Sequence, residues 1–199
     1  MNMKWMLAMV MMMGMTTGQA QEPTQEPTRA ILAGGCFWCL QHDLEGKDGI
    51  VSTHVGYAGG DRPSPVYETY HDVDATYKVP HIEVVEVVYD PAKMSFKQLL
   101  ELYVRNIDPT DGEGQFCDRG PGYRPAIFVK DAAERVVAEV VLADAAREIG
   151  QAVDVDILPD ARFWPGEDYH QHYATKNPTR YKYYRWSCGR DARVKKVWG

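Results

Sequence analysis

The run from 81 to 89, HIEVVEVVY, places the strongest constraint on the fold. Its residues are mostly β-branched, and apolar side chains occupy both sets of alternating positions, so both faces of this strand must be covered. The surrounding pattern predicts one α+β domain over 29–199, a mixed β-sheet with packed helices in a two-layer α/β sandwich. The other predicted strands are 29–32, 49–57, 126–129 and 153–158, and the predicted helices are 36–45, 95–106, 131–150 and 169–177.

Local signals set several of these boundaries. Ser95 and Gln98 have the spacing of a capping box, which marks the first turn of a helix. Asp131 is a good N-cap for the next helix, which Gly150 ends. The segment 108–123 is long, glycine-rich and irregular, and a loop of this length in a compact domain is usually functional. The basic, aromatic segment 180–199 shows no clear period, so we predict a long irregular C-terminal tail.

The first twenty residues differ from the rest of the chain. An apolar run follows Lys4, and small residues lead up to Ala20, which predicts a secretory signal peptide at 1–20. An uncleaved interfacial anchor is the alternative. The polar segment 21–28 repeats Gln-Glu-Pro-Thr and reads as a linker. We therefore expect an exported, periplasmic protein without stable membrane association after cleavage, and the net charge of −6 argues against a nucleic-acid partner.

The hexapeptide GGCFWC at 34–39 points to cysteine chemistry. The four cysteines stand at 36, 39, 117 and 188, and a structural zinc site would need two close pairs where this chain has one. We therefore expect no metal and no cofactor. Three interpretations remain: an inert buried thiol in a non-enzymatic envelope protein, a thioredoxin-like Cys-x-x-Cys oxidoreductase, and a single nucleophilic cysteine whose partner lies elsewhere.

The neighbours of Cys36 favour the nucleophile. Gly34 and Gly35 let a ligand approach the backbone, and they place Cys36 at the start of a helix, where the backbone dipole lowers a thiol pKa. Phe37 and Trp38 follow directly, where a thioredoxin motif carries more compact residues. Two bulky rings at this point suggest a wall for a small apolar group.

GGCFWC resembles the signature of the methionine sulfoxide reductase A family. The resemblance covers about residues 28–199, and it implies a ferredoxin-like core and an enzyme that reduces the S epimer of methionine sulfoxide, peptide-bound and free. Exported proteins would be the substrates repaired. Five further motifs carry the resemblance: VGYAGG at 55–60, HIEVV at 81–85, QFCDRG at 115–120 with GYRPAIF at 122–128, DYHQHY at 168–173, and NPTRYKYYRWSCGRD at 177–191.

The resemblance implies roles for the residues of the first motif. Cys36 would attack the sulfoxide sulfur and become a sulfenic acid as methionine leaves. Phe37 and Trp38 would hold the substrate methyl group. In the family's histidine-x-glutamate strand, Glu83 would be the general acid, because an apolar setting raises a carboxyl pKa. Glu86 lies on the opposite face of the same strand and serves as an internal control without a catalytic role.

Tyrosines and an aspartate complete the expected site. Tyr70 and Tyr123 resemble the two tyrosines that bind the sulfoxide oxygen in the family, and a phenol can donate one hydrogen bond while it stays neutral. The segment between Tyr70 and the acid differs from that of relatives by one residue, so Tyr67 is the alternative to Tyr70. Asp118 would order its loop or bind the substrate backbone.

Regeneration of the thiol requires a second cysteine. Cys188 resembles the family's resolving cysteine and is our first choice. Cys39 is second, since it lies one helical turn from Cys36 but on a rigid helix. Cys117 replaces an asparagine of other members and is the third candidate, with a plain loop residue as the alternative interpretation. The resulting disulfide would be reduced by a thioredoxin-like donor, and we expect a monomer.

Overall fold

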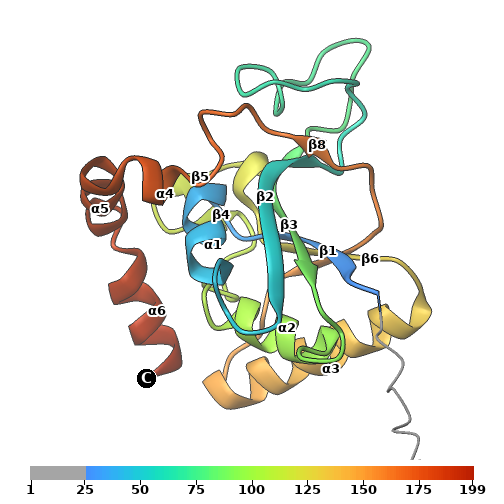
Figure 1. The fold of residues 1–199 in the computed structure, drawn as a ribbon, viewed down its shortest axis with the longest axis vertical. Coiled ribbons are helices and arrows are strands. Elements are labelled where there is room, and N and C mark those ends of the chain that lie inside the picture. Colours follow the sequence, from blue (N-terminus) through green and yellow to red (C-terminus); the bar gives the residue numbers. More distant parts are fainter. Residues whose placement is uncertain (1–25) are drawn as a thin grey trace, which may run out of the picture.

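A computed structural model describes residues 26–199. The signal peptide predicted at 1–20, and 21–25 of the predicted linker, lie outside these described residues. The main sheet has six strands in the order β7-β6-β1-β3-β2-β8 (Figure 1). All neighbours pair antiparallel except β6 and β7, which are parallel. Its strands are β1 (Thr28–Ala33), β2 (Ile50–Ala58), β3 (Ile82–Tyr89), β6 (Ala126–Val129), β7 (Asp156–Pro159) and β8 (Trp164–Pro165).

Two helices connect the four central strands. Helix α1 (Phe37–Leu44) joins β1 to β2, and α2 (Phe96–Val104) joins β3 to β6. The chain order β1-α1-β2-β3-α2-β6 and the spatial order β6-β1-β3-β2 are those of a ferredoxin-like core, as expected. Helix α3 (Ala132–Ile149) packs on α2, and β7 then extends the sheet.

Strand β3 has the central position that its sequence predicts. Val85 lies opposite Leu32 of β1 and Val55 of β2, and these three side chains belong to the core between the sheet and the helices. On the other face, Ile82 and Val84 belong to a second cluster, against which residues of the 158–163 segment pack. Because alternate side chains point to opposite faces, an apolar strand fills both cores.

The predicted caps are confirmed. Ser95 accepts a hydrogen bond from the backbone of Gln98, and the Gln98 side chain accepts one from the backbone of Ser95, which closes a capping box on α2. Asp131 Oδ1 accepts a hydrogen bond from Glu134 N at 2.9 Å, and Gly150 ends α3 in the left-handed conformation at φ 69°.

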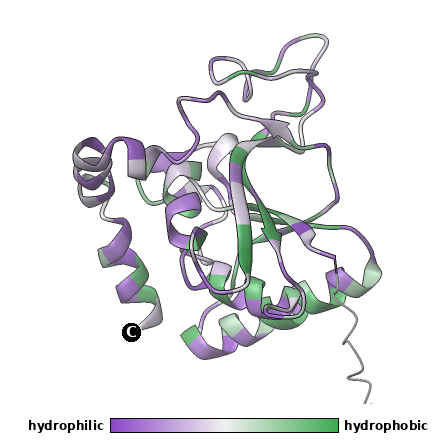
Figure 2. Cartoon of the chain, in the orientation of Figure 1, coloured by the Kyte–Doolittle hydropathy of each residue, from purple (hydrophilic) through white to green (hydrophobic). Residues whose placement is uncertain are grey.

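The prediction of an irregular C-terminal tail is wrong. Residues after 172 form three helices, α4 (Tyr173–Lys176), α5 (Pro178–Ser187) and α6 (Arg190–Trp198), which lie together beside α1 (Figure 1). Pro178 begins α5 where we expected it to end a helix. Hydrophilic residues cover much of α5 and α6 (Figure 2), so they show no apolar period. The only buried residues of these two helices are Tyr181 and Arg190, which belong to types that periodicity does not detect.

The long loop before β6 contains only short elements. These are β4 (Gly114–Gln115), β5 (Asp118–Arg119) and a 3-10 turn, η1 (Pro121–Tyr123). Gln115 is fully buried, and its amide exchanges hydrogen bonds of 2.8 and 2.7 Å with the backbone of Asp108. These hydrogen bonds therefore hold the middle of the loop against its first residue. Among residues 26–199, no helix is long and apolar enough to cross a membrane.

Candidate active site

Cys36 sits at the turn between β1 and α1, as its N-cap. Gly35 has φ +74°, and a Cβ on it would lie 2.5 Å from the Cβ of Gln115, so both conformation and space require glycine. The turn therefore lies directly against the long loop. Cys36 itself is only 6% exposed, and its carbonyl accepts the first helical hydrogen bonds, including that of Leu40 N at 3.2 Å.

The Cys36 side chain opens into a small pocket. The pocket has a volume of about 80 Å³ and draws its walls from α1, β3, the long loop and α5. Its lining combines aromatic rings with hydroxyl and carboxyl groups. Its lining consists of Cys36, Phe37, Trp38, Tyr67, Glu83, Asp118, Tyr123 and Tyr184.

Glu83 is a buried acid beside Cys36. It is 2% exposed, and its Oε2 accepts a hydrogen bond from Phe37 N at 2.9 Å. Its Oε1 accepts one from the Tyr70 hydroxyl at 3.3 Å. Burial outweighs these two contacts and raises the pKa of Glu83 to about 8. Most of Glu83 therefore carries a proton at neutral pH, as a general acid must.

Glu86 has the opposite environment on the same strand. It is half-buried, and its Oε2 lies 3.7 Å from a guanidinium nitrogen of Arg29. It does not line the Cys36 pocket. The strand period thus places one glutamate in the pocket and the other on the far face, as the alternation predicts.

The resting thiol of Cys36 differs from the sequence expectation. We expected the helix N-terminus to lower its pKa, but burial dominates and raises the pKa of Cys36 well above the ordinary value for a thiol. The first helical N–H group, that of Phe37, points at Glu83 and not at the sulfur. Cys36 and Glu83 both hold their protons at neutral pH, so neither charge is buried before substrate arrives.

The tyrosines separate into two groups. Tyr67 and Tyr123 line the pocket, and burial raises the pKa of each, so both stay neutral hydrogen-bond donors. Tyr70 is 2% exposed and lies behind Glu83, with its ring stacked on Tyr57 at a centroid distance of 4.9 Å. The structure therefore places the alternative, Tyr67, on the pocket wall, and it places Tyr70 against the acid.

The apolar wall is held from several sides. Phe37 is 1% exposed and packs 5.9 Å from the Tyr57 ring. The Trp38 indole stacks on Tyr173 at 3.7 Å with 7° between the planes. Its N–H donates a hydrogen bond of 3.0 Å to His170 Nδ1. Trp38 is therefore locked in one orientation at the pocket edge.

Asp118 and Tyr184 also line the pocket, where the Tyr184 ring meets Trp38 edge-on at a centroid distance of 6.0 Å. The Tyr184 hydroxyl donates a hydrogen bond of 2.6 Å to Asp118 Oδ2. Burial raises the pKa of Asp118, and its contact with Tyr184 joins the long loop to α5. Sequence reasoning missed Tyr184, although Tyr181, Tyr184 and Cys188 have the spacing of one helix face.

The four cysteines form two unlike pairs. Cys117 and Cys188 form a disulfide with a Cα–Cα distance of 4.9 Å, so Cys117, the third candidate, is bonded to the first and is not a plain loop residue. Cys36 and Cys39 are free thiols, 6% and 2% exposed. Within residues 26–199, one group of metal-ligand side chains clusters, Cys117, Asp118 and Cys188. Its two sulfurs are bonded to each other, which leaves no thiolate for a metal.

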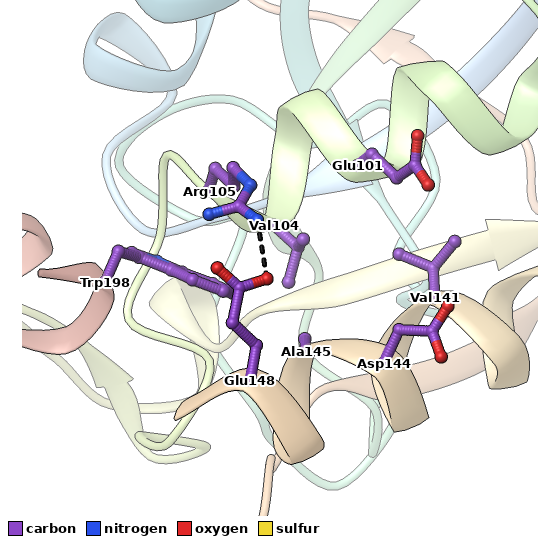
Figure 3. A pocket seen from close by; sticks show the side chains of 8 residues that line it. All are labelled: Glu101, Val104, Arg105, Val141, Asp144, Ala145, Glu148 and Trp198. Atoms are coloured by element: carbon purple, nitrogen blue, oxygen red, sulfur yellow. Dashed lines mark hydrogen bonds and ion pairs between the residues drawn. The ribbon is translucent and has the colours of Figure 1, made fainter. Parts of the chain in front are cut away.

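A larger pocket elsewhere has no comparable chemistry. It has a volume of about 240 Å³ and lies between α2, α3 and the end of α6 (Figure 3). Arg105 bridges it, 2.6 Å from Glu148 and 4.9 Å above the Trp198 ring. Its lining contains no cysteine, histidine, serine or threonine. The smaller Cys36 pocket is therefore the candidate active site.

Comparison with known proteins finds the same chemistry in one family. The family model for peptide methionine sulfoxide reductase matches residues 28–199. Peptide methionine sulfoxide reductase MsrA 2 of Caulobacter vibrioides is 45% identical over 193 residues, which cover 96% of this chain and 95% of that protein. The protein of the same name from Rhizobium meliloti is 44% identical over 174 residues, 87% of this chain and 85% of that protein.

Solved structures agree with the fold. Reduced Mxr1 from Saccharomyces cerevisiae superposes with a TM-score of 0.69 at 29% identity, over 81% of this chain and 91% of that one. Methionine sulfoxide reductase A of Corynebacterium diphtheriae has a TM-score of 0.65 at 31% identity, over 81% of this chain and 77% of that one. The structural similarity thus extends over about four fifths of this chain.

Proposed function

Since the chain belongs to the peptide methionine sulfoxide reductase family, we propose that its Cys36 pocket reduces the S epimer of methionine sulfoxide, peptide-bound and free. The proposal rests on one observation, which is that three kinds of group lie together in this pocket. A nucleophilic sulfur and a carboxylic acid with a pKa of about 8 line the same pocket, and two aromatic rings form its apolar wall.

The first step is the transfer of oxygen to Cys36. Glu83 donates its proton to the sulfoxide oxygen, which makes the substrate sulfur electrophilic. The Cys36 thiol loses its proton as it attacks that sulfur. The oxygen then passes from the substrate sulfur to the Cys36 sulfur: the substrate S–O bond and the bond between the two sulfurs both break as the S–O bond of the Cys36 sulfenic acid forms, and methionine leaves. The thiol proton restores the acid on Glu83, so the overall change is thiol plus sulfoxide to sulfenic acid plus thioether.

Two walls of the pocket account for the choice of epimer. The hydroxyl groups of Tyr67 and Tyr123 are the donors for the sulfoxide oxygen. Phe37 and Trp38 form the apolar surface for the methyl group. With attack from Cys36 on the third side, only one configuration at sulfur satisfies all three contacts.

Regeneration proceeds through Cys188. Its thiol attacks the sulfenic acid, which forms a Cys36–Cys188 disulfide and releases water. The Cys117 thiolate then attacks the Cys188 sulfur, which forms the Cys117–Cys188 disulfide and returns Cys36 as a thiol. Two residues of the pocket lining support this sequence of steps. Asp118 directly follows Cys117, and Tyr184 lies one helical turn before Cys188.

A thioredoxin-like reductant ends the cycle at the exposed disulfide. Cys117 is exposed, whereas Cys36 and Cys39 are buried, so a protein dithiol reaches only the outer pair. Attack on that disulfide leaves two thiols on the enzyme and one disulfide on the reductant.

The proposed cellular setting follows from the first residues. We propose that the signal peptide at 1–20 directs export to the periplasm, where the 29–199 domain acts as a monomer, without stable membrane association, on oxidised exported proteins. Mass measurement of the mature protein from the periplasmic fraction tests cleavage after Ala20. An intact first residue in a cytoplasmic fraction would contradict export.

Reaction with separated epimers tests the proposed activity. Wild-type protein should consume a dabsylated S epimer and leave the R epimer, as followed by chiral chromatography with dithiothreitol as reductant. Cys36→Ser should release no methionine, whereas fully reduced Cys39→Ser, the matched change in the same helix, should release one per enzyme when it is given one equivalent of the S epimer without reductant. Equal consumption of both epimers, or activity in Cys36→Ser, would overturn the assignment.

A further inference from the structure

We propose that Arg190 is a positioning residue for the thiol relay that converts the Cys36 sulfenic acid back to a thiol, beginning with the attack by Cys188. This inference rests on the proposed function, because it assigns a role within the relay from Cys36 through Cys188 to Cys117. It concerns a residue that is not part of the lining of the Cys36 pocket.

The Arg190 side chain is a buried cation, and each nitrogen of its guanidinium group has a hydrogen-bond acceptor. It is 2% exposed. Its Nε donates a hydrogen bond to Asp43 Oδ2 at 3.2 Å, and its two terminal nitrogens donate to Gly34 O at 3.3 Å and Asn106 O at 2.7 Å. The guanidinium also lies 4.6 Å from the centre of the Phe116 ring. The planar group therefore has four partners in fixed directions.

Three of these four partners are chain neighbours of the cysteines. Gly34 stands two residues before Cys36, and Phe116 directly precedes Cys117. Asp43 follows Cys39 by one helical turn, and Arg190 itself is two residues after Cys188. One guanidinium thus joins the segments that carry all four sulfurs. Exchange between three of them requires those segments to keep their relative positions to a fraction of an ångström.

The turn that carries Cys188 depends on this anchor. Cys188 ends α5, and Gly189 adopts the left-handed conformation at φ 68° before α6 begins at Arg190. Cys188 therefore lies on a short glycine-containing turn between two helices, where its sulfur has to face first Cys36 and then Cys117. Arg190 fixes the end of that turn, while Arg185 holds the α5 side by donating to Asp43 Oδ1 at 2.7 Å.

Attachment of α6 does not depend on Arg190 alone. Arg193 contacts Asp108 at 2.5 Å, and the Trp198 indole donates to Ile107 O at 3.3 Å. Replacement of a buried ion pair by apolar groups is often tolerated, so such a pair is weak evidence for a stabilising role. The distinctive feature of Arg190 is the identity of its partners. Arg193 is the matched control, because it anchors the same helix without touching a cysteine-bearing turn.

Two rates, measured in three variants, separate positioning from general stability. We compare Arg190→Met, Arg190→Lys and Arg193→Met with wild type in one turnover without reductant. Methionine release should stay within about twofold in all of them. Loss of the sulfenic acid, trapped with dimedone, should slow by about tenfold or more in Arg190→Met, since small displacements cost about that much or more. Arg190→Lys should recover part of the rate, and Arg193→Met should match wild type.

Several outcomes would overturn the role of Arg190. Equal slowing of methionine release and of sulfenic acid loss would indicate a structural effect, and so would a slow Arg193→Met. If Arg190→Met does not fold, Arg190→Lys and the double variant Asp43→Asn with Arg190→Met decide by the same two rates. Cys188→Ser distinguishes failure of the proposed relay from failure of the role of Arg190. If Cys188→Ser cycles normally with thioredoxin, the relay itself is contradicted. If Cys188→Ser is inactive but Arg190→Met loses its sulfenic acid at the normal rate, only the role of Arg190 is refuted.

Discussion

The two cysteine pairs of this enzyme occupy opposite environments. Cys36 and Cys39 are buried, reduced and one helical turn apart, whereas Cys117 is exposed and bonded to Cys188 across 71 residues of sequence. Burial suits the first pair, because a sulfenic acid in a closed pocket is protected from further oxidation. Exposure suits the second, because a protein reductant has to reach it. The comparison shows that chemistry and regeneration are kept apart and have to be connected.

The largest expected effect comes from the acid at the buried end. Glu83→Gln should slow methionine release in a single turnover by about 10²–10⁴-fold, the usual contribution of a positioned general acid. Glu86→Gln, three residues along the same strand, should stay within about twofold, because it does not line the pocket. Rapid-quench measurement of released methionine gives both rates. Equal slowing in the two variants would contradict the assignment of Glu83 as the acid, because the two glutamates lie on opposite faces of β3.

The outer pair should affect turnover and spare the first step. Cys188→Ser and Cys117→Ser should each release one methionine per enzyme, yet steady-state turnover with thioredoxin should fall by about 100-fold, since the exposed disulfide is never formed. The two variants differ in what accumulates: a sulfenic acid on Cys36 in the first, and a Cys36–Cys188 disulfide in the second. Thioredoxin turnover by Cys117→Ser at the wild-type rate would show that reduction occurs at the buried end.

The pKa of Glu83 also predicts a pH dependence of stability. Its pKa is raised to about 8 in the fold from an ordinary 4.5, so the folded protein holds a proton that the unfolded chain has lost. Between these values, wild type should lose about 1.4 kcal/mol of unfolding free energy per pH unit relative to Glu83→Gln. Below about pH 4.5 and above about pH 8 the difference should become constant. Urea titrations from pH 4 to pH 9 measure it, and a constant difference throughout would contradict a buried neutral acid.

The smallest predicted effect distinguishes two neighbouring tyrosines. Tyr67→Phe should slow methionine release by about tenfold, the value of one neutral hydrogen bond in a buried site. Tyr70→Phe should slow it less, but it removes a hydrogen bond that lowers the pKa of Glu83, so the alkaline decline of the rate should move to higher pH. A pH profile for each variant separates the roles. The reverse pattern would make Tyr70 the oxygen-binding residue.

Much of the core follows from local sequence signals. Strand β3 is apolar at both sets of alternating positions, so its central place and the opposite faces of Glu83 and Glu86 were predictable. The caps at Ser95 and Asp131 use short-range hydrogen bonds, which a sequence motif records directly. The turn that places Cys36 beside Phe37 and Trp38 was predictable for the same reason, because these residues are consecutive in the sequence.

Long-range packing of polar and aromatic side chains was not predictable in this way. Helices α5 and α6 bury Tyr181 and Arg190 where periodicity expects aliphatic residues, so their sequence resembled an irregular tail. Neither residue spacing nor composition relates Cys117 to Cys188, because only the fold brings the long loop to α5. The positions of Tyr67 and Tyr70 depend on the conformation of the loop that carries them. A difference of one residue in the length of that loop changes which tyrosine reaches the pocket.

One measurement tests the transfer between the two environments most directly. Fully reduced enzyme is given one equivalent of methionine-S-sulfoxide without reductant, quenched with an alkylating agent, digested and mapped by mass spectrometry. The structure predicts one methionine released per enzyme, a Cys117–Cys188 disulfide, and alkylated Cys36 and Cys39. A Cys36–Cys39 disulfide beside alkylated Cys117 and Cys188 would contradict the account, because oxidation would then never leave the buried pair.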